Sequence, residues 1–474
     1  MASPTERVVK AEYYQITGNP YLDAMPGMVS QTEFYKRVSS RMRLPTDVEF
    51  LNPEERRKLL TGLTSWFLPM GYMYNMYDML YRAVITTYQT KTVVEAIQQM
   101  NGLYVDSVNG YGSRMQYGTQ AFSGAVLGVP GIGKSSTLQR CLSLMPQVIR
   151  HTNYQGQKCF EQQINYLFVE CPSDCSVKTL VFNVLSAIDR AIESNYIGNN
   201  SFIKGNSASA LTSKLKIICM NHHIGLIVID EIQNAVTTAR EKNQLRPLIK
   251  FLVELTNETN TGICFCGTLE AEDLFLSQEH LKRRTRGFRL LPMKFDISYR
   301  KFITELWKYQ VVLKPKPLTE ALMKQLFDLS GGIPAYIVKI FSEAQADAII
   351  TGVETLNFQN MKTAVERASI VVPKTFRYAG TSISDFMSMQ DIVETSQEGD
   401  TAIIKSDEED SATVLPEEPK ASEMPAKRFY ATTRGRRKVE RDDEDVIIIC
   451  KKFKVESDSI KQLEVASLLE RRTW

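Results

Sequence analysis

Residues 128–135 carry the residue types and spacing of a phosphate-binding loop. Glycines let a backbone fold closely around phosphate oxygens and direct its N–H groups inward, and the start of a following helix adds a positive dipole end. An apolar run precedes these residues and a helix-like run follows them, so we expect a strand, a loop and a helix here and not a bland glycine-rich turn. We assign nucleotide binding to Gly128, Val129, Pro130, Gly131, Ile132, Gly133, Lys134, Ser135 and Ser136.

Two adjacent carboxylates, Asp230 and Glu231, follow the unbroken apolar run at residues 225–229. Such a run is typical of a parallel strand that is buried on both faces, and open α/β sheets bind ligands at the carboxyl ends of their strands. A solvated strand end is the simpler interpretation of two acids alone, but the upstream loop favours a shared site. We therefore expect ATP and Mg²⁺ as cofactors, with the metal held by Asp230 and Ser135 and the terminal phosphates held by Lys134. Glu231 is the candidate general base that polarises the attacking water.

The next polar position after a buried run is Thr268, which follows the apolar residues 262–266. A basic cluster comes next and contains Arg283, Arg284 and Arg286, and a helical pattern extends from about residue 299 to residue 350. This order resembles that of AAA+ ATPases, in which a polar residue beside the acidic strand senses the γ-phosphate. In that arrangement an arginine completes the site of the neighbouring subunit, because positive charge is needed where the transition state spreads negative charge. A solvated basic loop is the alternative interpretation of the arginines.

Length and composition set the limits of the architecture. The chain has 474 residues, 43% of them hydrophobic, so we expect two or three domains. Its net charge of +3 neither favours nor excludes nucleic acid as a partner. Its eight cysteines form no disulfide or zinc pattern and are interpreted as buried free thiols. With neither a signal peptide nor an apolar run of membrane-spanning length, we expect a cytoplasmic protein without a membrane partner.

The predicted fold class is α/β, with a P-loop AAA+ domain built on a doubly wound, mostly parallel sheet. The aromatic and methionine-rich run at residues 64–85 suits a core helix, and a partner-docking surface is the alternative. His222 and His223 are interpreted as ordinary surface or helix-end residues. The expected regions are an aromatic-rich helical or extended N-terminal extension (1–100), the nucleotide-binding core (101–300), a helical lid (301–370), and a charged, mostly disordered tail with a short docking segment (371–474).

Several stretches, in the same order, resemble the TnsC-type ATPases of bacterial DNA transposons, which are related to the TniB proteins. The resemblance extends more distantly to origin-recognition and helicase-loader AAA+ proteins. It covers about residues 18 to 350 and does not include the tail. The stretches are residues 18–26 with the Asn-Pro-aromatic segment, residues 67–71, residues 128–136 with 145–149, the acidic strand at 225–233, and residues 337–341.

The resemblance implies an adaptor that assembles with ATP as a ring or filament on double-stranded DNA. Such a protein takes instructions from a target-selection protein and recruits transposase subunits, and ATP hydrolysis resets the assembly. Ala335 stands where many AAA+ proteins carry a lid arginine, and Lys339 is the candidate substitute. Two alternatives stay open: a helicase-loader or origin-type AAA+ ATPase, and a nucleotide-switched scaffold without significant hydrolysis.

Candidate DNA contacts lie at two places in the predicted core. Lys178 and Thr179 start a helix after the second strand, and Arg240 and Lys242 follow the acidic strand. Lining a central pore, these residues would grip phosphates and not bases, which gives sequence-tolerant and salt-sensitive binding. The simpler interpretation of each residue alone is a solvated polar group. Only assembly of several copies would align these residues into a continuous DNA-binding track.

Overall fold

The computed structural model describes residues 7–89, 91, 121–198, 207–234, 245–272, 286–373 and 379–385. All of them lie in the first of two compact units, residues 1–403. A six-stranded sheet with the order β5-β6-β7-β2-β8-β9 forms the centre, and every pair of neighbouring strands is parallel. The strands are β2 (Ser123–Gly128), β5 (Tyr166–Glu170), β6 (Leu226–Asp230), β7 (Gly262–Gly267), β8 (Arg286–Leu291) and β9 (Thr381–Ser382).

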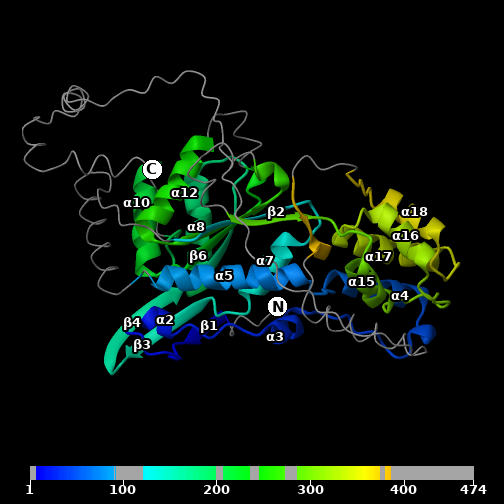
Figure 1. Cartoon of the computed structure of the whole chain (residues 1–474), viewed down its shortest axis with the longest axis horizontal. Helices are drawn as coiled ribbons and strands as arrows, with labels where there is room; N and C mark the ends of the chain where they lie inside the picture. Colours follow the sequence, from blue (N-terminus) through cyan, green and yellow to red (C-terminus); the bar gives the residue numbers. More distant parts are fainter. Residues whose placement is uncertain are drawn as a thin grey trace, which may run out of the picture. The chain divides into compact units, whose positions relative to one another are not determined.

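Helices cover both faces of this sheet, which explains why every residue of β6 and β7 is buried. Helices α8, α10 and α12 lie together on one face, and α5 and α7 lie on the other (Figure 1). The predicted α/β class with a doubly wound parallel sheet is therefore confirmed. The helices of the two layers are α5 (Gly71–Gln89), α7 (Lys134–Leu142), α8 (Val177–Ile192), α10 (Ala208–Asn221) and α12 (Leu245–Thr259).

A second, three-stranded sheet was not predicted. It pairs β1 (Val8–Lys10) with β3 (Val148–Tyr154), and β3 with β4 (Gln157–Ile164), in an antiparallel hairpin. Gln155 and Gly156 form the two-residue turn and both have positive φ, which matches the right-handed twist of the flanking strands. Strand β4 ends at Ile164, and β5 of the large sheet begins two residues later at Tyr166.

The N-terminal region wraps onto the core. Asn19 joins two of its helices, since its side-chain oxygen caps the start of α2 while its amide nitrogen donates to the Tyr88 carbonyl at the end of α5 (2.7 Å). Along α5 the predicted aromatic and methionine stripe is buried, including Tyr72, Met76 and Tyr77, so core packing is confirmed. The further elements of this region are α2 (Pro20–Asp23), α3 (Gln31–Val38), α4 (Pro53–Leu59) and the 3₁₀ turns Val48–Phe50 and Leu60–Thr64.

Four helices follow β8 in the part of the chain where the lid is predicted. Helix α17 packs against α16 and α18 (Figure 1), and its buried face includes Ile337, Phe341 and Ala344. Trp307 of α15 contacts Phe341 with a ring-centroid distance of 5.4 Å, which closes the small core of the lid. The helices are α15 (Ile297–Trp307), α16 (Glu320–Ser330), α17 (Pro334–Ile350) and α18 (Phe358–Arg367), and the 3₁₀ turns Leu269–Ala271 and Ile383–Asp385 complete the described elements.

The remaining composition-based expectations are met in part. The seven cysteines among the described residues are free thiols, and all except Cys159 are buried, as predicted. His222 caps the end of α10 and the N–H of His223 donates to the Met220 carbonyl in its last turn, so both are helix-end residues, as expected; His223 is only 7% exposed, so a surface position for it is wrong. No helix within the described ranges is long and apolar enough to cross a membrane. Cys450 and the tail from residue 386 onward lie outside the described residues.

Candidate nucleotide-binding site

The predicted phosphate-binding loop connects the end of β2 to the start of α7. Gly131 and Gly133 have φ angles of +81° and +92°, a backbone conformation that residues with side chains rarely adopt. Val129 and Ile132 are buried and anchor the loop on the core, while Pro130 is exposed. The sequence therefore places glycines where the backbone must turn and apolar residues where the loop must be held.

Lys134 is the first residue of α7. Its Nζ donates to the carbonyl oxygens of Gly128 (2.9 Å) and Val129 (3.1 Å) within the loop. Burial lowers the pKa of this ammonium group, and the nearby carboxylates of Glu231 and Asp230 offset part of the shift. A polyphosphate held by the loop would supply further negative charge and favour the charged form of the lysine.

The acidic strand ends beside this lysine. Asp230 is 8% exposed, and its Oδ1 accepts a hydrogen bond from the backbone N–H of Glu231 (3.0 Å). On the neighbouring strand, burial raises the pKa of Cys266 well above its ordinary value, and a hydrogen bond with Asp230 adds to the shift. Ser135 lies in the first turn of α7 and is partly buried, whereas Ser136 is exposed. A carboxylate and a hydroxyl at the carboxyl edge of a parallel sheet are the hard oxygen donors that suit Mg²⁺.

Glu231 and Thr268, predicted from separate strands, are connected by one side chain. Gln233 Nε2 donates to the carboxylate of Glu231, and Gln233 Oε1 accepts from the backbone N–H of Thr268 (3.0 Å). The hydroxyl group of Thr268 donates to Glu270. The structure thus brings the candidate base and the candidate sensor into one hydrogen-bonded group.

The lid contacts the phosphate-binding loop through the first turn of α17. The backbone N–H of Ala335, in the first turn of α17, donates to the carbonyl oxygen of Gly131 (3.1 Å). A Cβ atom added to Gly131 would lie 3.0 Å from Ile333 Cγ2, so the two segments are in close contact. The loop backbone and the first turn of α17 are therefore in direct contact.

The N-terminal region contacts the phosphate-binding loop through α5. Tyr72, in the first turn of α5, is fully buried, and its hydroxyl group donates to the Ile132 carbonyl (3.4 Å) and lies 3.5 Å from Thr137 Oγ1. Burial raises the pKa of Tyr72, which keeps the phenol neutral. The Cys141 thiol of α7 donates to the Met73 carbonyl (3.5 Å), so α5 holds both the loop and its helix.

The remaining predicted site residues lie on α17 and α8, apart in the chain from the phosphate-binding loop and the acidic strand, or they lie outside the described residues. Lys339 is exposed on α17, and its Nζ donates to the Ala368 carbonyl (3.4 Å). Lys178 is exposed in the first turn of α8, and the Thr179 hydroxyl donates to Asp174 (2.8 Å). Their roles stay predictions. Arg286 is the first residue of β8. The predicted site residues that lie outside the described residues are Arg240, Lys242, Arg283 and Arg284.

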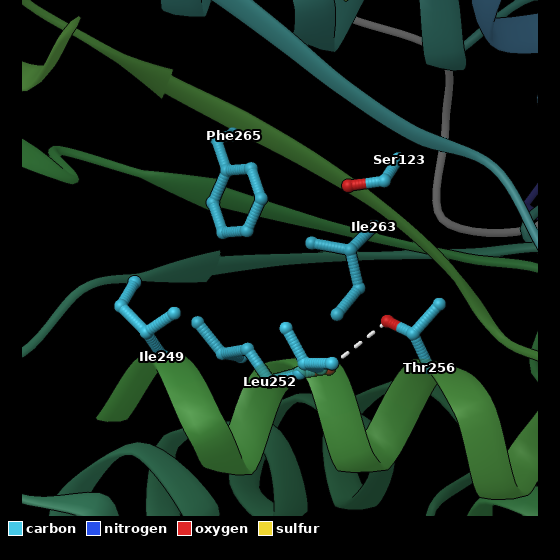
Figure 2. A pocket seen from close by; sticks show the side chains of 7 residues that line it. Ser123, Ile249, Leu252, Thr256, Ile263 and Phe265 are labelled. Carbon is cyan, nitrogen blue, oxygen red and sulfur yellow. Dashed lines mark hydrogen bonds between the residues drawn. The ribbon is translucent and has the colours of Figure 1, made fainter. Parts of the chain in front are cut away.

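A small hollow between α12 and the sheet is unsuited to phosphate (Figure 2). It lies between α12 and strands β2 and β7, on the face opposite α7, and apolar side chains form most of its lining. The Thr256 hydroxyl donates to the Leu252 carbonyl within its own helix (3.0 Å). The lining residues are Ser123, Ile249, Leu252, Val253, Thr256, Ile263 and Phe265.

Residues 118–275 match the family model described as an AAA domain. The chain contains an AAA domain. The match covers the phosphate-binding loop, the acidic strand and Thr268, and with the parallel sheet it confirms the predicted P-loop AAA+ fold. The matched description names no transposition system.

Several solved structures are similar to this chain. The ORC2 protein of Aeropyrum pernix, in ADPNP and ADP complexes, has 14% identity and a TM-score of 0.35, covering 59% of this chain and 68% of that chain. A Walker-type ATPase of Pyrococcus abyssi has 15% identity and a TM-score of 0.35, covering 57% and 71%. Drosophila ORC bound to DNA has 12% identity and a TM-score of 0.34, covering 72% and 74%. No curated protein matches the chain in sequence.

Sequence reasoning missed two residues of the site. Gln233 was noted only as part of the resemblance, although its position two residues after Glu231 was a signal that the two side chains share a turn. Tyr72 was counted among the aromatic stripe, and nothing in its spacing distinguishes it from its neighbours. Only the packing of α5 against α7 places its hydroxyl group at the loop.

Proposed function

We propose that the chain is an ATPase whose ATP-bound state assembles on double-stranded DNA and regulates DNA transposition. In this role it links a target-selection protein to transposase subunits. The observation that carries the proposal is the contact of Tyr72 with the Ile132 carbonyl in the phosphate-binding loop. Tyr72 belongs to the N-terminal region whose motifs resemble those of the transposition regulators. Through this contact the region can respond to nucleotide at the loop.

The chemistry proposed for the site is hydrolysis of ATP to ADP and phosphate. The loop N–H groups and Lys134 bind the phosphates, and Ser135 and Asp230 hold Mg²⁺, which neutralises charge on the phosphate oxygens. Glu231 orients a water and accepts its proton as the water oxygen bonds to the γ-phosphorus and the bond to the β,γ-bridging oxygen breaks. Thr268 lies on the neighbouring strand end, where it would contact the γ-phosphate.

Assembly completes the proposed switch. Arg283 or Arg284 of one copy would stabilise the transition-state charge in the site of the next copy. Lys178, Thr179, Arg240 and Lys242 would then contact DNA phosphates along a shared track, which predicts binding that weakens steeply with salt. Contact between α17 and Gly131 supports a lid that follows the state of the loop.

Electron microscopy of the protein with duplex DNA tests the switch. We expect rings or filaments with ATP or a slowly hydrolysed analogue, and none with ADP or without nucleotide. Glu231→Gln should retain ATP and stabilise the assemblies, because binding survives when the general base is lost. Lys134→Ala should prevent them, because the phosphates lose their cation. Equal assembly by both variants, and by the unaltered protein without ATP, refutes the switch.

Two alternative functions are distinguished by product and by partner. A scaffold without significant hydrolysis would assemble equally well but release no phosphate. An origin-type or helicase-loader ATPase would also hydrolyse ATP and assemble on DNA, so only the identity of its partner protein distinguishes it from a transposition regulator. ATP-dependent stimulation of transposase-catalysed DNA joining supports the proposal, whereas ATP-dependent loading of a replicative helicase would replace it.

A further inference from the structure

One amide side chain connects the two strand ends of the site. Gln233 offers a donor and an acceptor in one plane, and each meets a partner of the opposite kind: the Glu231 carboxylate accepts from Nε2, and the Thr268 backbone N–H donates to Oε1 (3.0 Å). A flipped amide would place its oxygen against the carboxylate and its NH₂ group against an N–H. Only the observed orientation therefore satisfies both contacts.

The backbone around this amide is held at several points. Ile232 is fully buried, and its N–H donates to the Cys266 carbonyl on β7 (2.9 Å). The N–H of Asn234 donates to the Glu231 carbonyl (2.9 Å), which closes a turn in which Glu231 has a φ of +55°. The turn therefore directs both Glu231 and Gln233 to the same side of the strand end.

Gly267, the last residue of β7, leaves the space through which the amide reaches Thr268. A Cβ atom at this position would lie 2.5 Å from Gln233 Oε1 and 2.8 Å from Ile232 Cγ2. Contacts this short do not occur for real Cβ atoms, so any other residue would displace Gln233 or Ile232. The strand end and the amide are thus sterically matched.

We infer that Gln233 is a positioning residue for ATP hydrolysis, holding the Glu231 carboxylate at a set distance from the end of β7. This inference rests on the proposed hydrolytic function. A glutamate side chain has several rotamers, and a general base acts only when it lies within hydrogen-bond reach of its water. The bond to Oε2 leaves Oε1 to accept the water proton. The hydrogen bond from the Thr268 N–H to Gln233 fixes the position of the candidate base, Glu231, relative to the candidate sensor, Thr268.

Gln233→Met tests this role, because methionine has similar length but lacks the amide donor and acceptor. Positioning predicts that kcat for phosphate release falls about ten-fold, a part of the 10²–10⁴-fold that general base catalysis contributes. KM and the affinity for a fluorescent ATP analogue should change less than about two-fold, because the phosphate-binding residues are untouched. Gln139→Met is the matched control, since Gln139 is exposed on α7, and it should retain the full kcat.

A second comparison separates positioning from folding. In a Glu231→Gln background, Gln233→Met should lower the rate no further, because the group that it positions is already lost. A Gln233→Met protein with unchanged kcat, or with KM raised and thermal stability lowered at unchanged kcat, overturns the positioning role alone. Unaltered protein that binds ATP but releases no phosphate refutes the proposed hydrolysis, and the positioning role with it.

Discussion

Glu354→Gln is expected to weaken the joint between the N-terminal region and the lid. Arg56 of α4 is 1% exposed, and its guanidinium group donates to both carboxylate oxygens of Glu354, at 2.6 and 2.7 Å. It also donates to the carbonyls of Val311 (3.2 Å) and Leu51 (3.3 Å). Glutamine keeps the shape of the side chain but removes its charge, which leaves a buried guanidinium ion balanced only by carbonyl dipoles.

The expected loss in the free energy of unfolding follows from the burial of the ion pair and from its hydrogen bonds. Removing one partner of a buried ion pair costs about 3–5 kcal/mol. We expect about 3 kcal/mol for Glu354→Gln, at the low end of that range, because the amide oxygen still accepts one guanidinium N–H. Glu54→Gln is the matched control, because Glu54 lies on α4, the helix that carries Arg56. Its partner Arg57 lies 3.5 Å away, the two side chains are 73% and 38% exposed, and such surface pairs contribute about 1 kcal/mol or less.

Tryptophan fluorescence during urea unfolding is a suitable assay. Of the three tryptophans, Trp66 reports this joint, since it contacts Phe302 of the lid with a centroid distance of 5.1 Å, and Trp307 reports the lid itself through its contact with Phe341. Equal losses of stability for Glu354→Gln and Glu54→Gln would refute the reasoning.

Acid offers a second check of the same ion pair. The hydrogen bond from Arg56 lowers the pKa of Glu354, so the unfolded chain takes up the proton first as the pH falls. The stabilisation is therefore complete above the ordinary glutamate range and is lost as the pH falls through the lowered pKa. The difference between the unaltered protein and Glu354→Gln should shrink in acid.

Two further predictions concern buried ionisable side chains, Lys91 and Asp23, that bond the N-terminal region to the core through Ile224 and Tyr154. Burial lowers the pKa of Lys91 to about 7, so the unfolded chain binds more protons above pH 7 and stability should rise with pH by up to about 1.4 kcal/mol per unit. Lys91→Met should remove this slope between pH 7 and 9 in urea unfolding, and an unchanged slope would contradict the assignment. Asp23 is fully buried and accepts from Thr17 N (2.9 Å), Thr17 Oγ1 (2.6 Å) and Tyr154 OH (2.6 Å). Asp23→Ala should lower the free energy of unfolding by about 2–3 kcal/mol and make the backbone around Thr17 more accessible to limited proteolysis, because these donors lose a charged partner. Cleavage at the unaltered rate would contradict this prediction.

Local features of the chain were predictable from the sequence. Lys178 and Thr179 lie in the first turn of α8, where the start of a helix was expected, because Ser176 caps this helix and its apolar residues recur at helical spacing. The β3–β4 hairpin was missed because Gln155-Gly156 is a weaker turn signal than Asn-Gly or Asp-Gly, and because its buried polar residues hide the alternation of a half-buried strand. His151 and Gln163, for example, are buried and bonded to each other at 2.8 Å.

By itself the sequence determined the phosphate-binding loop and the acidic strand. Their chemistry depends on neighbouring residues: glycines that permit positive φ, a lysine at the start of a helix, and two carboxylates at a strand end. Tertiary structure alone decided which distant groups meet. It joined Glu231 to Thr268 through Gln233, set Tyr72 behind the loop, and paired Arg56 with Glu354 across 298 positions of the chain. Contacts between residues so far apart leave no local pattern, because they depend on how whole helices and strands pack.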